Sequence, residues 1–333
     1  MERVSDFYMI KRAKSIMLNS IENLCLDLTG FTVLTEVGSG NYCYLPLIAA
    51  LAGAKKVFAW TSDSPYGSGK AIAANCLKIA KEFCVSERIE IAVNEKPLDH
   101  IKNADIITNS GFLRPLNADK LAHAKKNVVI PLMYEAWELR DGEVDIDFCR
   151  DNGIKVAGTW ENHPLINVFE YVGMLASKMA FEAGYEIFQN RIAIWSNDEF
   201  GKVIEKAFLK MGAAEVLMTT NANELENAGY FDFVFFCDYD ETREILGPNG
   251  FLNAKLISNS GAGVVHLYGC INSIYLSEQG INVYPLKDGY ASRMTFTLGH
   301  VGPEPIIRLQ TAGLKVAQNM MKFTESDLNQ IIC

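Results

Sequence analysis

The sequence predicts an α/β protein with two lobes, each built on a parallel sheet, and a long helix between them. Short runs rich in Val and Ile alternate with helix-like stretches along the whole 333-residue chain. Such continuous apolar runs are typical of parallel strands that are covered on both faces. The alternation is interrupted once, by a long helical stretch after Pro164, and then starts again. A chain of this length is also expected to form about two domains.

The first lobe begins with a helical segment, residues 6–27, and continues as strands separated by helices. Helical spacing of apolar residues is clearest at 69–83, and further helices are predicted at 45–52 and 117–124. Apolar runs predict the strands, at 32–37, 56–60, 89–93, 105–108, 127–132 and 155–158. This alternation predicts one doubly wound, flavodoxin-like lobe.

The second lobe repeats the pattern after a long helix, predicted at 165–184. That helix is apolar on more than one face, which is wider than the single stripe of a surface helix. Further helices are predicted at 199–211 and, near the end of the chain, at 305–323. Apolar runs predict the strands, at 191–195, 215–219, 231–237, 256–258 and 282–285. A Rossmann-like lobe is therefore expected here.

Composition excludes several classes of protein. With 49% apolar and 21% charged residues, the chain is an ordinary globular protein rather than a disordered one. The net charge of −9 and the scattered Lys and Arg residues do not favour nucleic acid. The longest apolar run, residues 44–54, is about half of the roughly 20 residues that span a membrane, and the charged N-terminus is no secretory signal. We therefore expect a cytoplasmic protein without membrane or nucleic-acid partners.

The eight cysteines include no CxxC pair, and several lie in apolar periodic stretches. Buried, reduced thiols are therefore expected rather than disulfides. No metal cofactor is expected either.

Four segments of the second half resemble the D-2-hydroxyacid dehydrogenase superfamily in their order and spacing. Residues 152–159 are similar to the strand that ends the family's first lobe, and 191–220 has the place of its nucleotide-binding unit. Residues 256–265 resemble the motif INxxRGxxV. Residues 297–304, which run into 314–320, resemble TPHxGxxTxEA and the return helix that follows it.

This resemblance implies two Rossmann-like lobes joined by crossing helices. It places the C-terminal helix back on the first lobe, which makes that lobe discontinuous. The first, substrate-type lobe would comprise residues 1–164 and 305–333, and the second, nucleotide-binding-type lobe residues 165–304. The resemblance also implies NAD or NADP as the cofactor and a small polar metabolite, bound between the lobes, as the substrate.

The predicted nucleotide-binding loop departs from the family's fingerprint. A pyrophosphate needs the pattern GxGxxG, because the turn is tight and the backbone must approach the phosphates closely. This chain has Ser196-Asn-Asp-Glu-Phe-Gly201, in which Asp198 and Glu199 place two carboxylates where a phosphate should bind. Ser196 and Glu199 are instead predicted to form a capping box. A self-capped helix and a dinucleotide bound around Gly201 both remain open.

If a dinucleotide binds, the resemblance implies contacts from Ser196, Gly201, Thr219 and Asn259. The strand that ends near Thr219 offers neither an acidic residue for a ribose diol nor an arginine for a 2′-phosphate. The sequence therefore does not distinguish NAD from NADP.

The resemblance places the catalytic chemistry at His300, which matches the family's general acid and base. The motif does not fix the carboxylate that would orient this ring, and Asp288 is the nearest candidate upstream. Ala262 stands where the family has an arginine, so bidentate recognition of a substrate carboxylate is lost at that place. His300 is equally consistent with a loop residue that binds a backbone group.

The first lobe has a GxG turn, with Gly38 and Gly40, directly after its first predicted strand. Together with the next strand, this turn resembles motif one of S-adenosylmethionine methyltransferases, which implies that ligand as an alternative cofactor. The acidic residue expected after the second strand is replaced by Thr61, with Asp63 two positions later. A tight turn explains the two glycines without any cofactor.

Polar residues follow several predicted strands of the first lobe, at the edge where α/β sheets bind ligands. Lys70 ends a Gly- and Ser-rich loop that is either an anion-binding nest or a plain solvated loop. The remaining residues predicted to line a small-molecule pocket are Asn109, Tyr134, Glu135, Trp160 and Glu161. The alternative for Trp160 is packing at a hinge.

The sequence therefore predicts an enzyme with a D-2-hydroxyacid dehydrogenase-like fold that acts on a small polar metabolite as an NAD- or NADP-linked oxidoreductase. A methyltransferase or other adenosyl-ligand enzyme is one alternative. A non-catalytic binding protein that keeps the fold is another. The apolar surplus along residues 166–188 also predicts a homodimer, unless the C-terminal helix covers that surface.

Overall fold

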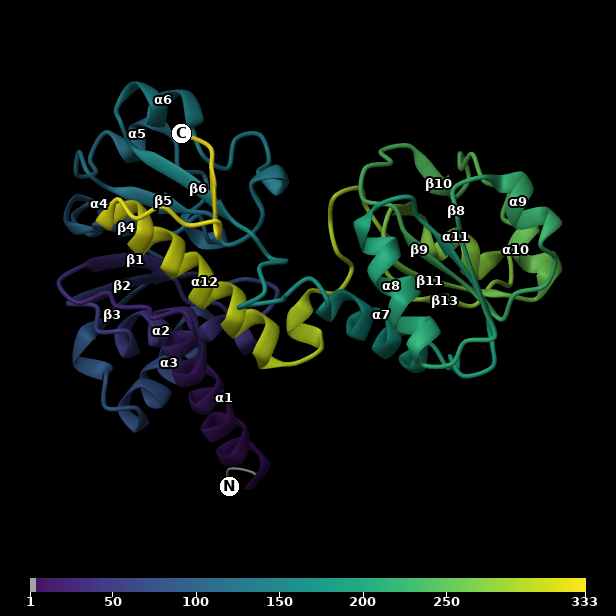
Figure 1. Cartoon of the computed structure of the whole chain (residues 1–333), viewed down its shortest axis with the longest axis horizontal. Coiled ribbons are helices and arrows are strands. Elements are labelled where there is room, and N and C mark those ends of the chain that lie inside the picture. The colour runs from purple at the N-terminus through teal and green to yellow at the C-terminus, as the bar shows by residue number, and fades with distance from the viewer. Residues whose placement is uncertain (1–3) are drawn as a thin grey trace. The chain divides into compact units, whose positions relative to one another are not determined.

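A computed structural model of the chain describes residues 4–333. The chain divides into two compact units (Figure 1), one formed by the residues up to Val168 together with Gly302–Cys333, the other by Phe169–Val301. Each unit is built around a largely or wholly parallel sheet that is packed with helices. The predicted fold class is thereby confirmed.

The first unit contains a seven-stranded sheet in the order β14-β6-β5-β4-β1-β2-β3. All of its pairs are parallel except β14 with β6. The strands are β1 (Thr32–Glu36), β2 (Lys56–Thr61), β3 (Ile89–Val93), β4 (Ile106–Ile107), β5 (Val129–Pro131), β6 (Lys155–Thr159) and β14 (Asn329–Ile331). The chain adds strands outward from β1 to β3 on one side and from β4 to β6 on the other. The strand order therefore reverses between β1 and β4.

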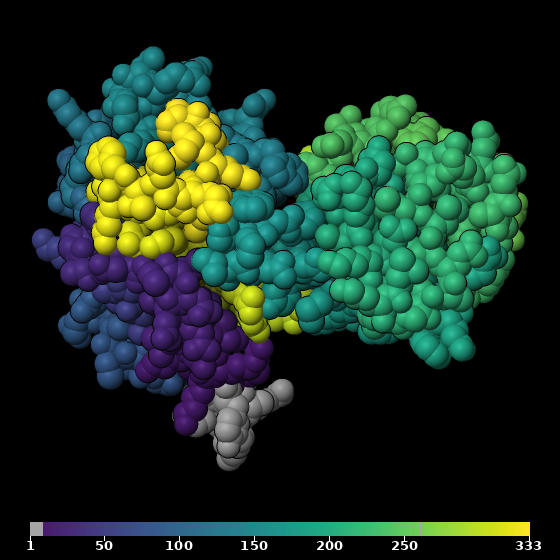
Figure 2. Space-filling view, viewed as in Figure 1, coloured from purple at the N-terminus to yellow at the C-terminus, as the bar shows by residue number. Residues whose placement is uncertain are grey.

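Helices cover this sheet, and the last of them brings the end of the chain back to the first unit. The helix α12 packs against α1, α2, β5 and β6, and Figure 2 shows the yellow C-terminal residues beside the purple α1. The helices are α1 (Val4–Asn23), η1 (Gly40–Cys43), α2 (Leu45–Leu51), α3 (Gly69–Glu82), η2 (Ser86–Arg88), α4 (Leu98–Asn103), η3 (Gly111–Leu113), α5 (Ala118–Leu121), η4 (Ala136–Glu138), α6 (Ile146–Asp151) and α12 (Pro303–Lys322).

The second unit contains a five-stranded parallel sheet in the order β13-β11-β9-β7-β8, with a separate pair, β10 and β12. The strands are β7 (Arg191–Trp195), β8 (Glu215–Thr219), β9 (Phe233–Cys237), β10 (Glu244–Leu246), β11 (Gly263–Tyr268), β12 (Cys270–Ile271) and β13 (Val283–Tyr284). The helices are α7 (Tyr171–Glu182), α8 (Glu199–Lys210), α9 (Ala222–Asn227), α10 (Lys255–Ser260), α11 (Ser273–Glu278) and η5 (Leu298–His300). The strand order reverses between β7 and β9.

The long helix predicted at 165–184 is shorter in the structure, because α7 begins only at Tyr171. The preceding residues form turns, and Asn167 has a φ of 45°, a left-handed conformation that an α-helix does not contain. Ile166 and Val168 are nevertheless buried. The buried apolar residues of these turns therefore have the spacing of a helix, although the backbone is not helical.

The strand predicted at 256–258 is wrong, since these residues lie in α10. The run is too short for its spacing to separate a strand from a helix. Gly261, with a φ of 76°, ends this helix, and β11 follows from Gly263. Ala262 therefore precedes strand β11, whereas the family motif has its arginine in the turn after a strand. The prediction that Ala262 occupies the position of that arginine is therefore wrong.

No helix in the described residues is long and apolar enough to cross a membrane.

Candidate functional site

A cavity of about 200 Å³ lies in the first unit at the carboxyl ends of β1, β4 and β5. Ligands of doubly wound α/β sheets bind at this edge, beside the point where the strand order reverses. Side chains from three strand ends and from α12 meet there. The lining residues are Glu36, Tyr42, Leu45, Ser110, Gly111, Arg114, Met133, Tyr134, Ile306, Leu309 and Gln310.

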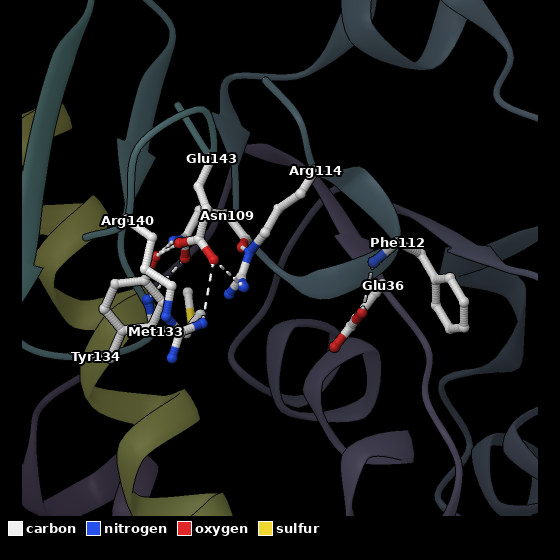
Figure 3. Close-up of polar contacts among 8 residues, drawn as sticks. All are labelled: Glu36, Asn109, Phe112, Arg114, Met133, Tyr134, Arg140 and Glu143. Carbon is white, nitrogen blue, oxygen red and sulfur yellow. Dashed lines mark hydrogen bonds and ion pairs between the residues drawn. The ribbon is translucent and has the colours of Figure 1, made fainter. Parts of the chain in front are cut away.

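Glu36, the last residue of β1, supplies the carboxylate of the cavity (Figure 3). Its Oε2 accepts a hydrogen bond of 2.9 Å from the backbone N–H of Phe112. Burial raises the pKa of Glu36 above its usual value, although this bond and the charge of Arg114 act in the opposite direction. A raised pKa favours the protonated form of this carboxyl, which can donate a proton as well as accept one when ionised.

Arg114 is held beside the cavity by two strong hydrogen bonds (Figure 3). Its Nε donates to the carbonyl oxygen of Asn109 at 2.5 Å, and its Nη1 donates to Glu143 Oε1 at 2.6 Å. Arg140 also reaches Glu143, at 3.3 Å. The guanidinium lies 5.4 Å from the ring centre of Tyr134. These contacts fix the Arg114 side chain, so little conformational entropy is lost if a ligand uses its remaining N–H groups.

Tyr134 and Asn109 complete this network. Asn109 Nδ2 donates to the Tyr134 hydroxyl at 2.6 Å, and that hydroxyl donates to Glu143. Asn109 Oδ1 accepts from the backbone N–H of Met133 at 2.9 Å. Burial and the neighbouring Glu143 raise the pKa of Tyr134, so its hydroxyl stays protonated and keeps donating. Asn109 and Tyr134 thus lie together, at a site for which the sequence proposed both.

Gln310 of α12 contributes to the cavity a buried side-chain oxygen that lacks a hydrogen bond within the described part of the chain. The residue is only 6% exposed, and its Oε1 has no hydrogen-bond partner among the described residues. An unpaired buried acceptor is costly, roughly 1–3 kcal/mol, and therefore uncommon. Together with Glu36, it gives the cavity two acceptors that a donor group on a ligand would satisfy.

Three further predicted residues lie near the ends of β5 and β6 but do not line the cavity. Glu135 Oε1 accepts from the backbone N–H of Glu161 at 2.8 Å, and Glu135 Oε2 accepts from the Gln330 side chain of β14. Burial, with its carboxylate neighbours, raises the pKa of Glu161 well above normal and that of Glu138 to about 7. Trp160 packs edge-on against His163, with ring centres 5.4 Å apart.

The glycine turn and its neighbours have structural partners. A Cβ on Gly38 would lie 2.8 Å from Tyr42 Cβ, and Gly40 has a φ of 57° at the start of η1. Asp63 accepts from the backbone N–H of Gly69, at 2.8 Å, at the beginning of α3. Lys70 is exposed on the same helix. These contacts explain the residues without an adenosyl ligand, so the methyltransferase alternative gains no support.

In the second unit, α8 caps itself, but through Asp198 rather than through the predicted pair of Ser196 and Glu199. Asp198 Oδ1 accepts from the Gly201 backbone N–H at 3.1 Å and from the Ser196 hydroxyl at 2.9 Å. Asp198 Oδ2 accepts from the Tyr239 N–H at 3.1 Å. Glu199 instead pairs with Lys202.

These residues do not fit a dinucleotide pyrophosphate in its usual position. The carboxylate of Asp198 lies at the start of α8 and already accepts the Gly201 amide, where a phosphate would bind. A Cβ on Gly201 would lie 2.5 Å from Ser196 Oγ, so this glycine serves local packing. The Thr219 hydroxyl donates to Glu224 at 2.6 Å. Asn259 lies on α10, before β11, at the opposite edge of the sheet from Ser196 and Thr219.

The structure does not bring His300 and Asp288 together. The Nε2 atom of His300 lies 2.7 Å from Glu182 Oε2, which also accepts from the Tyr284 hydroxyl at 2.6 Å. Burial acts to raise the pKa of Glu182, but these two bonds outweigh it and lower the pKa. Asp288 Oδ1 instead accepts from the backbone N–H and hydroxyl of Ser273.

Sequence reasoning missed Glu182 because it lies 118 positions before His300, at the end of another helix. It also missed Glu36, Arg114, Glu143 and Gln310 as site residues. Strand-end position is a signal that could have found Glu36. The other three are assembled by tertiary contacts alone, and no spacing in the sequence marks them.

No family model matches the sequence, and a search of curated proteins finds no match. Solved structures do match. The A chain of dipicolinate synthase from Bacillus subtilis has a TM-score of 0.54 and 14% identity, over 90% of this chain and 100% of that one. The NAD-dependent formate dehydrogenase from Staphylococcus aureus, in complex with NAD, has a TM-score of 0.51 and 11% identity, over 90% and 98%.

A D-lactate dehydrogenase from Treponema pallidum is similar as well, with a TM-score of 0.50 and 10% identity over 90% of this chain and 99% of that one. The chain thus shares the fold of these solved dehydrogenase structures, which is the fold that the resemblance implied, although the motif at 256–265 was matched to the wrong element. At these identities the likeness concerns the fold.

Proposed function

We propose that this protein is an enzyme that binds a small polar metabolite in the cavity at the carboxyl ends of β1, β4 and β5. The observation that carries the proposal is the unpaired, buried Oε1 of Gln310 in a cavity that also holds the Glu36 carboxyl. Both groups lie where the strand order reverses, which is the usual ligand position in such sheets. A ligand with a hydroxyl or amino group would supply the missing donor.

Three polar residues of the cavity have a role in this proposal. Gln310 and Glu36 accept hydrogen bonds from the ligand, and Arg114 faces an acidic or carbonyl group of it. Glu36 acts as the acid or base, since burial raises its pKa above the usual value of a carboxyl group. Leu45, Met133 and Leu309 supply apolar walls that exclude water.

The proposal is tested by thermal unfolding with a panel of small hydroxy, amino and keto acids. A ligand at about 100 times its dissociation constant adds roughly 2.7 kcal/mol of stability, which is a readily measured shift. The shift is expected to disappear in Glu36→Gln and to persist in Lys70→Ala, whose side chain is exposed on α3. A panel without any stabilising compound, or a shift that persists in Glu36→Gln, would contradict the assignment.

A nicotinamide-linked oxidoreductase is the second candidate function. The fold that the chain shares with the NAD-bound formate dehydrogenase favours it. The Asp198 cap opposes it, because a carboxylate and a pyrophosphate compete for the same amides. Titration of NADH and NADPH against the fluorescence of Trp195, the last residue of β7, tests this candidate. Saturable quenching below about 1 mM would support the oxidoreductase, and its absence would remove it.

A further inference from the structure

The second unit has a pocket of its own, of about 330 Å³, at the carboxyl ends of β7 and β9. The strand order of the second sheet reverses between these two strands, so the pocket has the same topological position as the cavity of the first unit. Its walls include Trp195, Asp238, Asp240, Glu241, Arg243 and Phe251. The site is distinct from the one assigned to the metabolite above.

Two backbone amides beside this pocket already bind a carboxylate. Asp198 accepts hydrogen bonds from the amide of Gly201 in the first turn of α8, from the hydroxyl of Ser196 after β7 and from the amide of Tyr239 after β9. The carboxylate therefore acts as an internal anion in the nest at the start of the twelve-residue helix α8. A phosphate would have to displace it and also face its negative charge.

The pocket itself carries an excess of negative charge. Asp238 is 8% exposed, and burial together with Asp198, Glu241 and Asp240 raises its pKa. The one basic residue in the lining, Arg243, donates both Nε and Nη2 to Glu241. Asp238 and Asp240 have no ion pair among the described residues. A cation in the pocket would relieve this repulsion.

Trp195 provides an independent sign of a ligand. This residue lines the pocket, is 1% exposed, and its indole N–H has no hydrogen-bond partner among the described residues. Buried indole N–H groups usually have an acceptor. The ring of Phe251 lies 6.3 Å from that of Trp195. The Arg243 guanidinium already lies 4.6 Å from the centre of the Phe251 ring, so this aromatic wall is one that a cation contacts.

We propose that the pocket of the second unit binds a small organic cation that carries a hydrogen-bond acceptor, and that Asp198 excludes nucleotide phosphates from it. The cation pairs with Asp238 and Asp240, and the acceptor receives the indole N–H of Trp195. The fold is thus retained while the ligand class changes from anionic to cationic.

Tryptophan fluorescence titrations of the full chain test both parts of the proposal. Choline and ethanolamine, which each carry a hydroxyl group as the acceptor, are the cationic probes, and NADH and inorganic phosphate are the anionic ones. We expect at least one cation to give saturable binding that weakens at least tenfold in the double variant Asp238→Asn, Asp240→Asn. We expect no saturation by NADH or phosphate at millimolar concentration. Cations that never saturate, or that bind the double variant equally well, would overturn the cation site.

Two matched variants test the exclusion of phosphate. Asp198→Ser keeps a residue that can cap α8 but removes the internal charge, and Glu199→Gln removes an exposed charge from the same helix turn. We expect phosphate or NADH binding to strengthen at least tenfold in the first variant and to stay unchanged in the second. An equal increase in phosphate or NADH affinity in both variants would show a general charge effect and would overturn the specific role of Asp198. Tight NADH binding by the wild type would also overturn this role of Asp198.

Circular dichroism confirms that each variant is folded. If Asp198→Ser unfolds, Asp198→Asn is measured in its place.

Discussion

At the residue scale, the two sites depend on polar groups that the fold leaves buried. Glu36 and Gln310 in the first unit, and Asp238 and Trp195 in the second, are each largely shielded from water. Burial of this kind costs free energy unless a partner is present. Residues of this type often mark functional sites, where stability is given up for binding.

Replacement of Gln310 by Met is expected to stabilise the ligand-free protein by about 1 kcal/mol, because it removes an unpaired buried acceptor at similar volume. The same change is expected to abolish metabolite binding. Urea unfolding measures the first effect and ligand-induced thermal shifts the second. A variant that is less stable than wild type by more than about 1 kcal/mol would mean that Gln310 has a structural partner after all.

The carboxylates at the ends of β5 and β6 predict a pH dependence. The folded-state pKa values of Glu138, about 7, and Glu161 are raised, so the folded state holds protons that the unfolded state has lost. The contribution of these two groups to the free energy of unfolding is therefore fully present below about pH 4.5. It is lost as the pH rises through their folded-state pKa values. Glu161→Gln is expected to be more stable than wild type at pH 8, by about 1–3 kcal/mol, and equal to it near pH 4.

Urea unfolding at several pH values measures this difference, and Glu87→Gln, at an exposed position of the same unit, serves as the control. A Glu161→Gln variant whose advantage over wild type does not change between pH 4 and pH 8 would show that Glu161 is already ionised in the folded protein.

At the element scale, most strands and the larger helices could be predicted because their apolar spacing reflects burial in a parallel sheet. Strands β3 and β7 have the predicted bounds, and β2 differs by one residue. The errors arose at short or irregular runs. Turns at 165–170, in which Ile166, Val168 and Phe169 are buried, have an apolar spacing like that of a helix, and residues 256–258 of α10 have the composition of a short strand. Site residues that depend on long-range contacts, such as Arg114, left no such local pattern.

The packing of α7 on α8 depends on Gly173. A Cβ at this position would lie 2.6 Å from the Cβ of Ala207, so the two helices approach more closely than alanine allows. Gly173→Ala is expected to destabilise the second unit by about 1–2 kcal/mol, because overpacking outweighs the better helix propensity of alanine. Glu226→Ala, at an exposed position of α9 in the same unit, is the control. Unchanged or higher stability of Gly173→Ala in urea would contradict the close packing.

At the scale of the whole molecule, we propose a homodimer formed through α7 and the residues that follow it. Met174, Phe181 and Phe188 are each more than half exposed on this segment, and Leu209 of α8 is 51% exposed. Large apolar side chains with this exposure favour an interface. Light scattering at micromolar concentration is expected to give twice the chain mass of 37.0 kDa, and a monomer mass for Phe181→Glu with Phe188→Glu. A wild-type mass near 37.0 kDa would refute the dimer.

Isothermal titration of the strongest stabilising compound measures whether the first unit binds a small polar metabolite between Glu36 and Gln310. We expect one site per chain in the wild type, a loss of at least tenfold in affinity in Gln310→Met, and unchanged affinity in Lys70→Ala. Equal affinity in the wild type and Gln310→Met would contradict the claim, since the ligand would then bind elsewhere.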